Sequence, residues 1–336
     1  MKQKQKNHRT NIIAEIGVNH NGDYETAKKL IKIAKICGAD FAKFQMYEPD
    51  EMVTDSAKKA NYQNSNMGKK LTQKKMLKKY YMNFKKIKNL KNYCDKIGIN
   101  FMASVFDEIS LRNYLKLNPK YLKLPSPEIN NYFLINKIKN IKKKISVLFS
   151  IGMSNTKDIL NFYRAMGKKE NLVPMYCVSS YPTKISEVNL KKIISLKKNS
   201  KTFGLSDHTE SFETSIISTF LGANFIERHI TLNKNQKGPD HSSSLDPNQF
   251  KMFINSVRNT ETLVSNKKIE AHEEHKNKKY VRKFLVAKKK INKGEKFSFE
   301  NVTCKRSGKI GLDPFSFVKI NNRKSKRSFT KDELIK

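Results

Sequence analysis

Two short stretches decide the fold of this chain: GLSDHT at residues 204–209 and FIERHIT at residues 225–231. Each is an apolar run that ends in a histidine, His208 in the first and His229 in the second, and a helix-like segment lies between them. Successive strands of a parallel α/β fold bring their carboxyl ends to the same face. We therefore expect two neutral imidazoles side by side over one pocket, able to hold a divalent metal ion with open coordination positions. The alternative is that both histidines are structural.

The same alternation of short β-branched runs and amphipathic helices occurs eight times along the chain. The expected strands are 12–17, 41–45, 99–106, 121–126, 145–152, 173–180, 202–208 and 225–230. After the first, the apolar face of TAKKLIKIAKICGAD predicts a helix that ends at Gly38. Eight βα repeats favour an α/β fold of the (β/α)8 TIM-barrel type over an open doubly wound sheet. No GxGxxG motif follows the first strand, which weakens the open alternative.

Composition limits the class of protein. The four cysteines form no CxxC pair and indicate reduced thiols in a cytoplasmic protein. The first residues, MKQKQKNHRTN, lack the apolar region of a signal peptide, and no apolar run is long enough for a membrane span. We therefore expect a cytoplasmic protein without a membrane partner.

The net charge of +38 raises the question of nucleic-acid binding. The lysines are spread over nearly every helical segment above an apolar stripe, as in KKIKNLKNYCDKIG at 85–98. Nucleic-acid-binding proteins instead gather basic residues on one face or arm, often with aromatic residues between them. The charge therefore indicates solvated helix faces and attraction of anionic substrates, and nucleic-acid binding is the minor alternative.

The chain is expected to contain two domains. Residues 1–268 form the barrel, 269–280 form a charged linker or an exposed helix, and 281–336 form a small β-rich domain. A long polar insertion follows the second strand, from MYEPDEMV to about Lys79. A loop of that length in a compact domain is usually functional, often as a lid or a dimer contact.

The expected barrel predicts the candidate site residues, because side chains at the carboxyl ends of its strands converge on one opening. Two lysines on buried strands need anionic partners, and serines beside them can donate hydrogen bonds to phosphate or carboxylate oxygens. The predicted site therefore holds a small anion beside a divalent metal, with carboxylates for proton transfer. Its members from the strand ends are Glu15, Lys43, Gln45, Ser104, Lys123, Ser126, Glu128, Ser179, Tyr181, Ser206, His208, Glu227 and His229.

Several motifs in order along the chain resemble the sialic acid (N-acylneuraminate, nonulosonic acid) synthase family. They are AEIGVNHNGDYETAKKLIKIAKICGADFAKFQ (14–45), LPSPEINN (124–131), SIGM (150–153), SSYPTKISEVNL (179–190), GLSDHT, ERHIT and GPDHSSSLDP (238–247). The tail RKFLVAKKKINKGEKFSFENVTCKRSGKIGL is similar to the antifreeze-like (SAF) domain of that family.

The resemblance implies condensation of phosphoenolpyruvate with an open-chain N-acylmannosamine-type sugar, giving a nine-carbon 2-keto acid and phosphate. It also implies that His208 and His229 hold Mn²⁺ and that Glu128 is the general acid/base. The residues it assigns to phosphoenolpyruvate are Lys43, Ser104, Lys123, Ser126, Ser179 and Ser206, and those it assigns to the sugar are Glu15, Gln45, Tyr181 and Asp240. Arg306 of the small domain would reach the N-acyl group in the other subunit, which implies a domain-swapped homodimer.

The chain departs from the family pattern at several positions. Prolines flank Ser126 in KLPSPE, and RSGKIG replaces the usual RPGxG. Ile151, Tyr176, Ser104 and Val105 also replace residues that are usual in the family. A proline has no N–H, so an amide that normally meets the phosphate would be lost. A legionaminic or pseudaminic acid synthase, acting on a 2,4-diacetamido-trideoxy hexose, is the alternative within the class. A basic binding module and a protein that uses phosphoenolpyruvate without a sugar are the alternatives outside it.

Overall fold

Eight parallel strands close into a barrel, with β1 hydrogen-bonded to both β2 and β8. In this computed structural model the described residues are 9–60, 63–64, 66, 72–167, 171–265 and 272–336. The strands are β1 Asn11–Gly17, β2 Phe41–Met46, β3 Asn100–Val105, β4 Tyr121–Leu124, β5 Ser146–Ser150, β6 Leu172–Cys177, β7 Gly204–Asp207 and β8 Phe225–His229. The predicted barrel is confirmed and the open sheet is excluded, although several strands end earlier than predicted.

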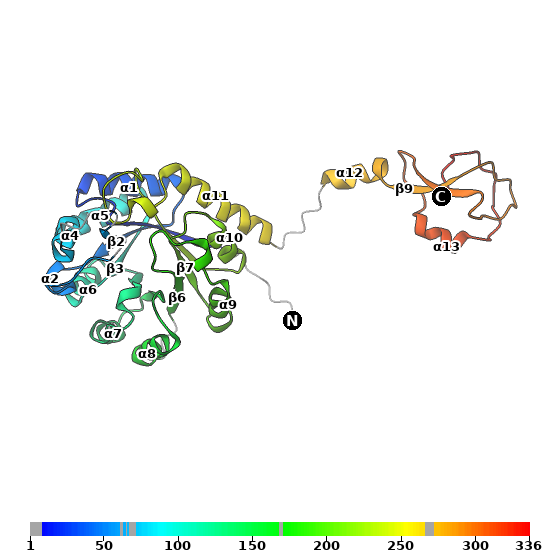
Figure 1. The fold of residues 1–336 in the computed structure, drawn as a ribbon. Helices are drawn as coiled ribbons and strands as arrows, with labels where there is room; N and C mark the ends of the chain where they lie inside the picture. Colours follow the sequence, from blue (N-terminus) through cyan, green and yellow to red (C-terminus); the bar gives the residue numbers. More distant parts are fainter. Residues whose placement is uncertain (1–8, 61–62, 65, 67–71, 168–170, 266–271) are drawn as a thin grey trace. The chain divides into compact units, whose positions relative to one another are not determined.

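Helices surround the strands and lie between them along the chain (Figure 1). They are α1 Tyr24–Cys37, α2 Pro49–Met52, α4 Gln73–Tyr80, α5 Phe84–Ile97, α6 Glu108–Leu115, α7 Tyr132–Lys139, α8 Thr156–Met166, α9 Leu190–Asn199, α10 Glu213–Phe220 and α11 Pro247–Val264. Helix α1 starts at Asp23, whose carboxylate accepts from the N–H of Thr26, and ends at Gly38 with φ of 99°. That left-handed conformation suits glycine, so the predicted helix end is confirmed.

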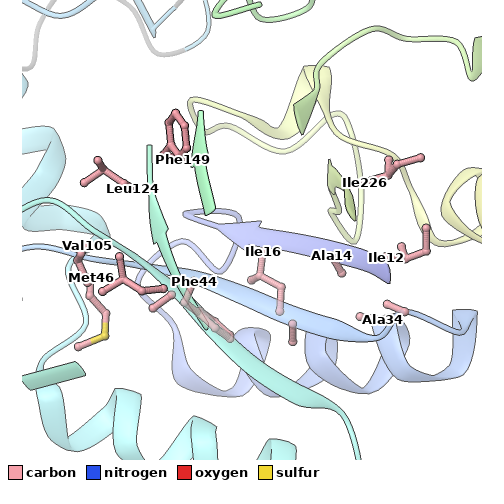
Figure 2. Packing of buried hydrophobic residues seen from close by; sticks show 14 of the residues in the cluster. Ile12, Ala14, Ile16, Ala34, Phe44, Met46, Val105, Leu124, Phe149 and Ile226 are labelled. Atoms are coloured by element: carbon pink, nitrogen blue, oxygen red, sulfur yellow. The ribbon is translucent and has the colours of Figure 1, made fainter. Parts of the chain in front are cut away.

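Successive side chains of each strand point alternately outward, toward the helices, and inward, into the barrel. The outward side chains form the main core, and the inward ones include those of the site. In β1, Ile12, Ala14 and Ile16 belong to the core between strands and helices, together with Phe44 and Ile226 (Figure 2). The side chains between them point into the barrel. Ile13 belongs to an apolar cluster there, with Phe41, Met102, Leu148, Val173, Met175 and Phe225. The next inward position on β1 after Ile13 is Glu15, which lines the cavity. A polar layer therefore follows the apolar cluster toward the carboxyl ends of the strands.

The predicted irregular insertion after β2 is partly helical. Thr72 caps α4, and Met76, Leu77 and Tyr80 of this helix are buried. They form a separate apolar cluster with Val18, Tyr47 and Phe106. The sequence predicted a polar insertion as far as about Lys79, and α4 departs from this because its short apolar stripe is surrounded by lysines in the sequence. Residues 61–62, 65 and 67–71 of the insertion lie outside the described residues.

The chain divides into two units, Met1–Ser265 and Asn266–Lys336. The predicted boundary at 268 falls within 266–271, outside the described residues. The second unit contains α12 His272–Val281 and an antiparallel pair, β9 Lys283–Ala287 with β10 Val302–Arg306. It also contains the short 3-10 helix η4 Pro314–Ser316 and α13 Phe317–Ile320. It has its own apolar core, formed by Leu285, Ala287, Ile291, Phe297, Val302, Phe317, Phe329 and Ile335.

Two sequence predictions about the whole chain can be compared with the structure. All four cysteine thiols are free, and Cys37, Cys94 and Cys177 are buried. Among the helices of the described segments, none has the length and apolarity needed to cross a bilayer.

Candidate active site

A cavity of about 760 Å³ opens at the carboxyl ends of the barrel strands. Its lining includes fourteen of the fifteen predicted site residues: Glu15, Lys43, Gln45, Ser104, Lys123, Ser126, Glu128, Ser179, Tyr181, Ser206, His208, Glu227, His229 and Asp240. The other, Arg306, is exposed on β10 of the second unit. Barrel geometry therefore gathers residues from positions 15 to 240 at one place, while their individual roles stay predictions.

Four alternating charges form the floor of the cavity. Lys43 Nζ lies 2.7 Å from Glu15 Oε2 and 3.5 Å from Glu227 Oε1. Lys123 Nζ donates to Glu227 Oε2 at 2.8 Å. Each of these four residues is at most 4% exposed. The sequence analysis expected anionic partners for both lysines, but it gave Glu227 no specific role. The structure makes Glu227 the carboxylate that both lysines share.

Burial and pairing act in opposite directions on these four groups. Burial disfavours the charged form of Lys43, but Glu15 and Glu227 outweigh it and raise the pKa of Lys43. Lys123 has one carboxylate partner and lies near Lys43, so burial prevails and lowers the pKa of Lys123. Burial also raises the pKa of Glu15. For Glu227 the two lysines overcome burial and hold its pKa well below the usual range, so Glu227 stays ionised.

The two predicted histidines lie together beside this floor, with ring centroids 5.3 Å apart. His208 Nδ1 is 2.8 Å from the carbonyl oxygen of Val178, which only accepts, so Nδ1 carries the proton and Nε2 has a free lone pair. The ring of Tyr181 packs on His208 at 4.1 Å between centroids. Burial lowers the pKa of His229 far below its usual value, aided by His208, Lys43 and Lys123. The surroundings of His229 therefore keep its imidazole neutral, whereas Cys177 outweighs burial and raises the pKa of His208, whose ring can bind a metal only in its neutral form.

The residues present fit a divalent cation. His229 Nδ1 is buried without a hydrogen-bond partner, and the nearest carboxylate oxygen, Asp240 Oδ2, is 3.7 Å away. Such an orphaned buried nitrogen is a candidate ligand atom. Over the described part of the chain, no group of three or more His, Cys, Asp or Glu side chains is placed to hold a metal. A cation here would therefore take two imidazoles from the protein and its other ligands from solvent or substrate.

A polar cradle lies where β4, β5 and β6 end. The N–H of Gly152 donates to Ser126 Oγ at 3.1 Å. A Cβ added at Gly152 would lie 2.4 Å from Ser179 Oγ and 2.7 Å from Ser126 Oγ. Only glycine leaves room for both hydroxyls at this point. The sequence motif SIGM contained this signal, but no site role was given to the glycine.

Glu128 lies on the 3-10 helix η1 Ser126–Glu128, half-buried at the cavity wall. Burial raises the pKa of Glu128, and a hydrogen bond from Asn131 Nδ2 to Oε2 at 2.7 Å opposes the rise. A carboxyl group with a raised pKa in a cavity is suited to proton transfer near neutral pH.

The insertion supplies an apolar wall that sequence reasoning missed. The side chains that line the cavity from this side are Val18, Tyr47, Met52, Val53, Met76, Leu77, Tyr80 and Phe106. Burial raises the pKa of Asp240 to about 7. Asp240 also adds to the raised pKa values of Tyr47 and Tyr80, which places it beside this wall. The predicted lid or dimer role of the insertion stays a prediction, but its helix α4 forms part of the cavity.

Some departures from the family pattern lie outside the cavity lining, whereas others, including Ser104, line it. Val105, Ile151 and Tyr176 belong to the main core rather than to the cavity lining. The hydroxyl of Tyr176 accepts from the N–H of Asn189 at 2.7 Å. Pro125 and Pro127 do line the cavity, on either side of Ser126. The concern about a lost phosphate amide therefore remains only for these prolines.

Several known proteins resemble this chain in sequence and in fold. The sequence profile of the NeuB family matches residues 30–269. The chain is 40% identical over 334 residues to the N,N'-diacetyllegionaminic acid synthase of Campylobacter jejuni, covering 98% of this chain and 99% of the relative. It is 32% identical to the N-acetylneuraminate-9-phosphate synthase of Homo sapiens, covering 96% and 90%. A crystal structure of the sialic acid synthetase from Leptospira borgpetersenii matches with a TM-score of 0.67 at 25% identity, covering 84% of this chain and 97% of that chain.

These matches extend over most of the chain and agree with the barrel. The chain belongs to the NeuB family. The resemblance predicted from the sequence motifs is thereby confirmed.

Proposed function

We propose that this enzyme is a phosphoenolpyruvate-dependent nonulosonic acid synthase whose sugar is a 2,4-diacetamido-trideoxy hexose, so that its product is a legionaminic-type acid. The observation that carries the proposal is one cavity in which paired lysines, serine hydroxyls and two buried histidines meet an apolar wall. The sequence put an N-acylmannosamine-type sugar first. The apolar wall and the 40% identity to a diacetyllegionaminic acid synthase favour the 2,4-diacetamido-trideoxy sugar instead.

The lysines and serines suit the anionic substrate. Lys43 and Lys123 carry the positive charge of the floor, and Ser104 accepts from Lys43 Nζ at 2.8 Å. Ser126 and Ser179 add two hydroxyls around Gly152. Phosphate and carboxylate oxygens take such donors in a dry site, where charge-assisted hydrogen bonds are strong. In the free protein Glu15 and Glu227 keep the two ammonium groups from being buried unpaired.

The reaction forms one carbon–carbon bond. C3 of phosphoenolpyruvate bonds to the aldehyde carbon of the open-chain sugar, and the aldehyde oxygen takes a proton. Water adds at C2, and phosphate leaves with the former bridging oxygen, which gives the 2-keto acid. Glu128 lines the cavity, and we expect it to hold or move a proton beside these carbons. Mn²⁺ held by His208 and His229 would supply a Lewis acid for the aldehyde oxygen. Fixing both substrates in one cavity removes much of the entropy of their encounter.

The apolar wall bears on the choice of sugar. Met76, Leu77 and Tyr80 are buried and line the cavity beside Asp240. A trideoxy sugar presents a methyl group where N-acetylmannosamine presents a hydroxyl, and a second acetamido methyl besides. Burying a hydroxyl against such a wall without a partner costs about 1–3 kcal/mol, whereas burying a methyl is favourable.

The test is phosphate release from phosphoenolpyruvate with Mn²⁺ and each sugar in turn. Release with the 2,4-diacetamido sugar at a kcat/KM at least ~10-fold above that with N-acetylmannosamine supports the proposal. A preference for N-acetylmannosamine contradicts the sugar assignment. Release that needs no sugar contradicts the condensation itself. Chelation should stop the reaction, and added Mn²⁺ should restore it.

Gly152→Ala tests the cradle. The new methyl must displace the hydroxyl of Ser126 or Ser179, and both are flexible ends, so the fold should tolerate it. Losing one charge-assisted hydrogen bond is worth about 1.5–3 kcal/mol, so we expect the KM for phosphoenolpyruvate to rise at least ~10-fold. The sugar KM and the unfolding temperature should change little. Ser154→Ala is the control, since Ser154 donates to the carbonyl of Gly152 but does not line the cavity. An unchanged KM for phosphoenolpyruvate would contradict this role.

Asn131→Ala tests Glu128 through pH. The variant removes the hydrogen bond that opposes the burial effect, so the pKa of Glu128 should rise further. The limb of the kcat/KM profile that reports Glu128 should therefore move to higher pH. Asn131 also caps α7, and its loss costs about 1 kcal/mol of stability. Asn155→Ala, which removes the matching cap of α8, should show the stability loss without the pH shift.

Arg306 and the oligomeric state form a separate part of the proposal. Arg306 is exposed and lines a cavity of about 540 Å³ on the second unit with Lys305, Lys309 and Arg327. We expect a homodimer in which this arginine reaches the sugar in the partner's barrel. Arg306→Ala should then raise the sugar KM without changing that of phosphoenolpyruvate. Sedimentation as a monomer at assay concentration, or an unchanged sugar KM, would contradict the swap.

A further inference from the structure

A buried ion pair lies on the outer side of the barrel, directly behind the two histidines. Asp207 of β7 and Arg228 of β8 are register partners, and each precedes a histidine in the chain. They are 3% and 1% exposed. The outward residues two positions earlier on the same strands, Leu205 and Ile226, belong to the main apolar core. On the outward face of both strands, an apolar residue is thus followed by a charged one, and that charged residue directly precedes the histidine of the site.

Arg228 joins β8 to the segment that follows His208. Its Nη1 donates to Asp207 Oδ2 at 3.1 Å and to the carbonyl of Ser211 at 2.6 Å. Its Nη2 donates to the carbonyl of Thr209. The guanidinium also lies 5.7 Å and 5.5 Å from the ring centroids of Phe212 and Phe253. One side chain therefore ties β8 to β7 and to the start of the β7–α10 connection.

Asp207 holds the same segment from the other strand. Its Oδ1 accepts from the N–H of Thr209 at 3.0 Å and from the hydroxyl of Thr209 at 2.8 Å. Its Oδ2 accepts from the hydroxyl of Ser215 on α10 at 2.6 Å. The carboxylate and the guanidinium together close a ring of hydrogen bonds around the backbone that follows His208.

The remaining contacts of His208 complete its placement. Its carbonyl accepts from the N–H of Thr183 at 2.9 Å, and its Nδ1 meets the carbonyl of Val178. The histidine is therefore held by the β6 side and by the Asp207–Arg228 pair, while Arg228 is the residue before His229 itself. The hydrogen bonds of Arg228 to the carbonyls of Ser211 and Thr209 thus link the segment after His208 to β8.

Stability alone is a weak reason for such a pair, because two apolar residues of similar volume are often as stabilising or more so. Geometry gives a stronger reason. A cation site with two protein imidazoles depends on their spacing being fixed in advance, since few other protein ligands compensate for a misplaced ring. Residues behind metal ligands commonly serve this purpose.

We propose that Arg228 and Asp207 are positioning residues that set the spacing of His208 and His229 and thereby the affinity for the divalent cation. This inference rests on the proposed function only in taking the two histidines as the cation's ligands. Neither residue is part of the cavity lining.

The experiment measures Mn²⁺ binding to the full-length chain without substrates, from the electron paramagnetic resonance signal of free Mn²⁺. Arg228→Lys keeps the charge but loses the planar fork. We expect it to raise the Kd for Mn²⁺ at least ~10-fold, within the range seen when groups behind metal ligands are removed. Ser215→Ala, which removes a single bond to Asp207, should raise the Kd by less and is expected to fold even if Arg228→Lys does not.

Arg258→Lys is the matched control. Arg258 is also an ion-paired arginine, bonded to Asp40, Glu261 and the carbonyl of Thr10 at the opposite end of the barrel. Its loss should lower the unfolding temperature and leave the Kd for Mn²⁺ unchanged. In turnover, Arg228→Lys should raise the Mn²⁺ concentration for half-maximal rate while the KM for phosphoenolpyruvate stays constant.

Arg228→Lys and Ser215→Ala proteins that bind Mn²⁺ within twofold of the parent would overturn the proposal, whatever their stability. A parent chain that binds no Mn²⁺ would overturn it as well. Failure of the proposed function looks different: the parent would release no phosphate with either sugar, while the comparison of Mn²⁺ affinities would still stand.

Discussion

His229→Ala is expected to reduce the rate of phosphate release by about three orders of magnitude in saturating Mn²⁺. His229 Nδ1 is a buried nitrogen with no hydrogen-bond partner, and burial keeps the ring neutral. Removing it leaves one imidazole to hold the cation. His208→Ala should have an effect of the same size, because the two rings lie 5.3 Å apart at the same cavity wall. Mn²⁺ titration of each variant, with phosphate release as the readout, measures the loss.

His241→Asn separates a ligand role from the general cost of losing a buried histidine. His241 is fully buried, but its Nδ1 contacts the hydroxyl of Thr231 at 2.7 Å and its Nε2 contacts Asn21 Oδ1 at 3.1 Å. Both nitrogens are used within the protein, so this variant should lose stability and keep its Mn²⁺ affinity. Wild-type Mn²⁺ affinity in His229→Ala would refute the two-histidine site and favour the structural alternative.

The barrel was predictable because its signal repeats. Each strand alternates between core residues such as Ile12, Ala14 and Ile16 and inward residues such as Glu15. The rule that strand ends converge then selected the cavity lining from sequence positions far apart. The motif resemblance led to the same residues independently and supplied Asp240, which lies after β8 rather than on a strand.

The parts that sequence reasoning missed depend on which side chains meet. Glu227 was visible as a strand-end carboxylate, but its position between Lys43 and Lys123 is set by the closure of the barrel. The stripe of α4 was hidden among lysines, so its contribution to the cavity wall was not foreseen. The sequence also could not show that Ile151, a departure from the family pattern, packs in the main core. The local sequence pattern predicts the helices and strands and which of their faces are buried. The pairing of buried charges depends on which strands become neighbours, and this is seen only in the folded structure.

Lys123→Met is expected to lower the free energy of unfolding by about 3–5 kcal/mol, because it leaves Glu227 as a buried carboxylate with too little positive charge. Lys123 Nζ is 2.8 Å from Glu227, and both side chains are at most 5% exposed. The floor changes from two positive and two negative groups to one positive and two negative. The loss of unfolding free energy relative to the parent should be smallest below the usual glutamate pKa of about 4.3, where Glu227 is protonated in the unfolded chain. The loss should grow as the pH rises. Chemical denaturation at several pH values measures it.

The double variant Lys123→Met/Glu227→Gln separates stability from substrate binding. It leaves Glu15 and Lys43 as a neutral pair 2.7 Å apart, so most of the lost stability should return. The KM for phosphoenolpyruvate should remain raised by at least ~10-fold, as in the single variant, because the ammonium group that meets the anion is still missing. Glu227→Gln alone is the control that keeps both lysines. A double variant as unstable as the single would show that Lys123 acts through packing. A double variant with parental KM would show that the lysine serves only to neutralise Glu227, because in that case the substrate's charge is met by Lys43 and the serines alone.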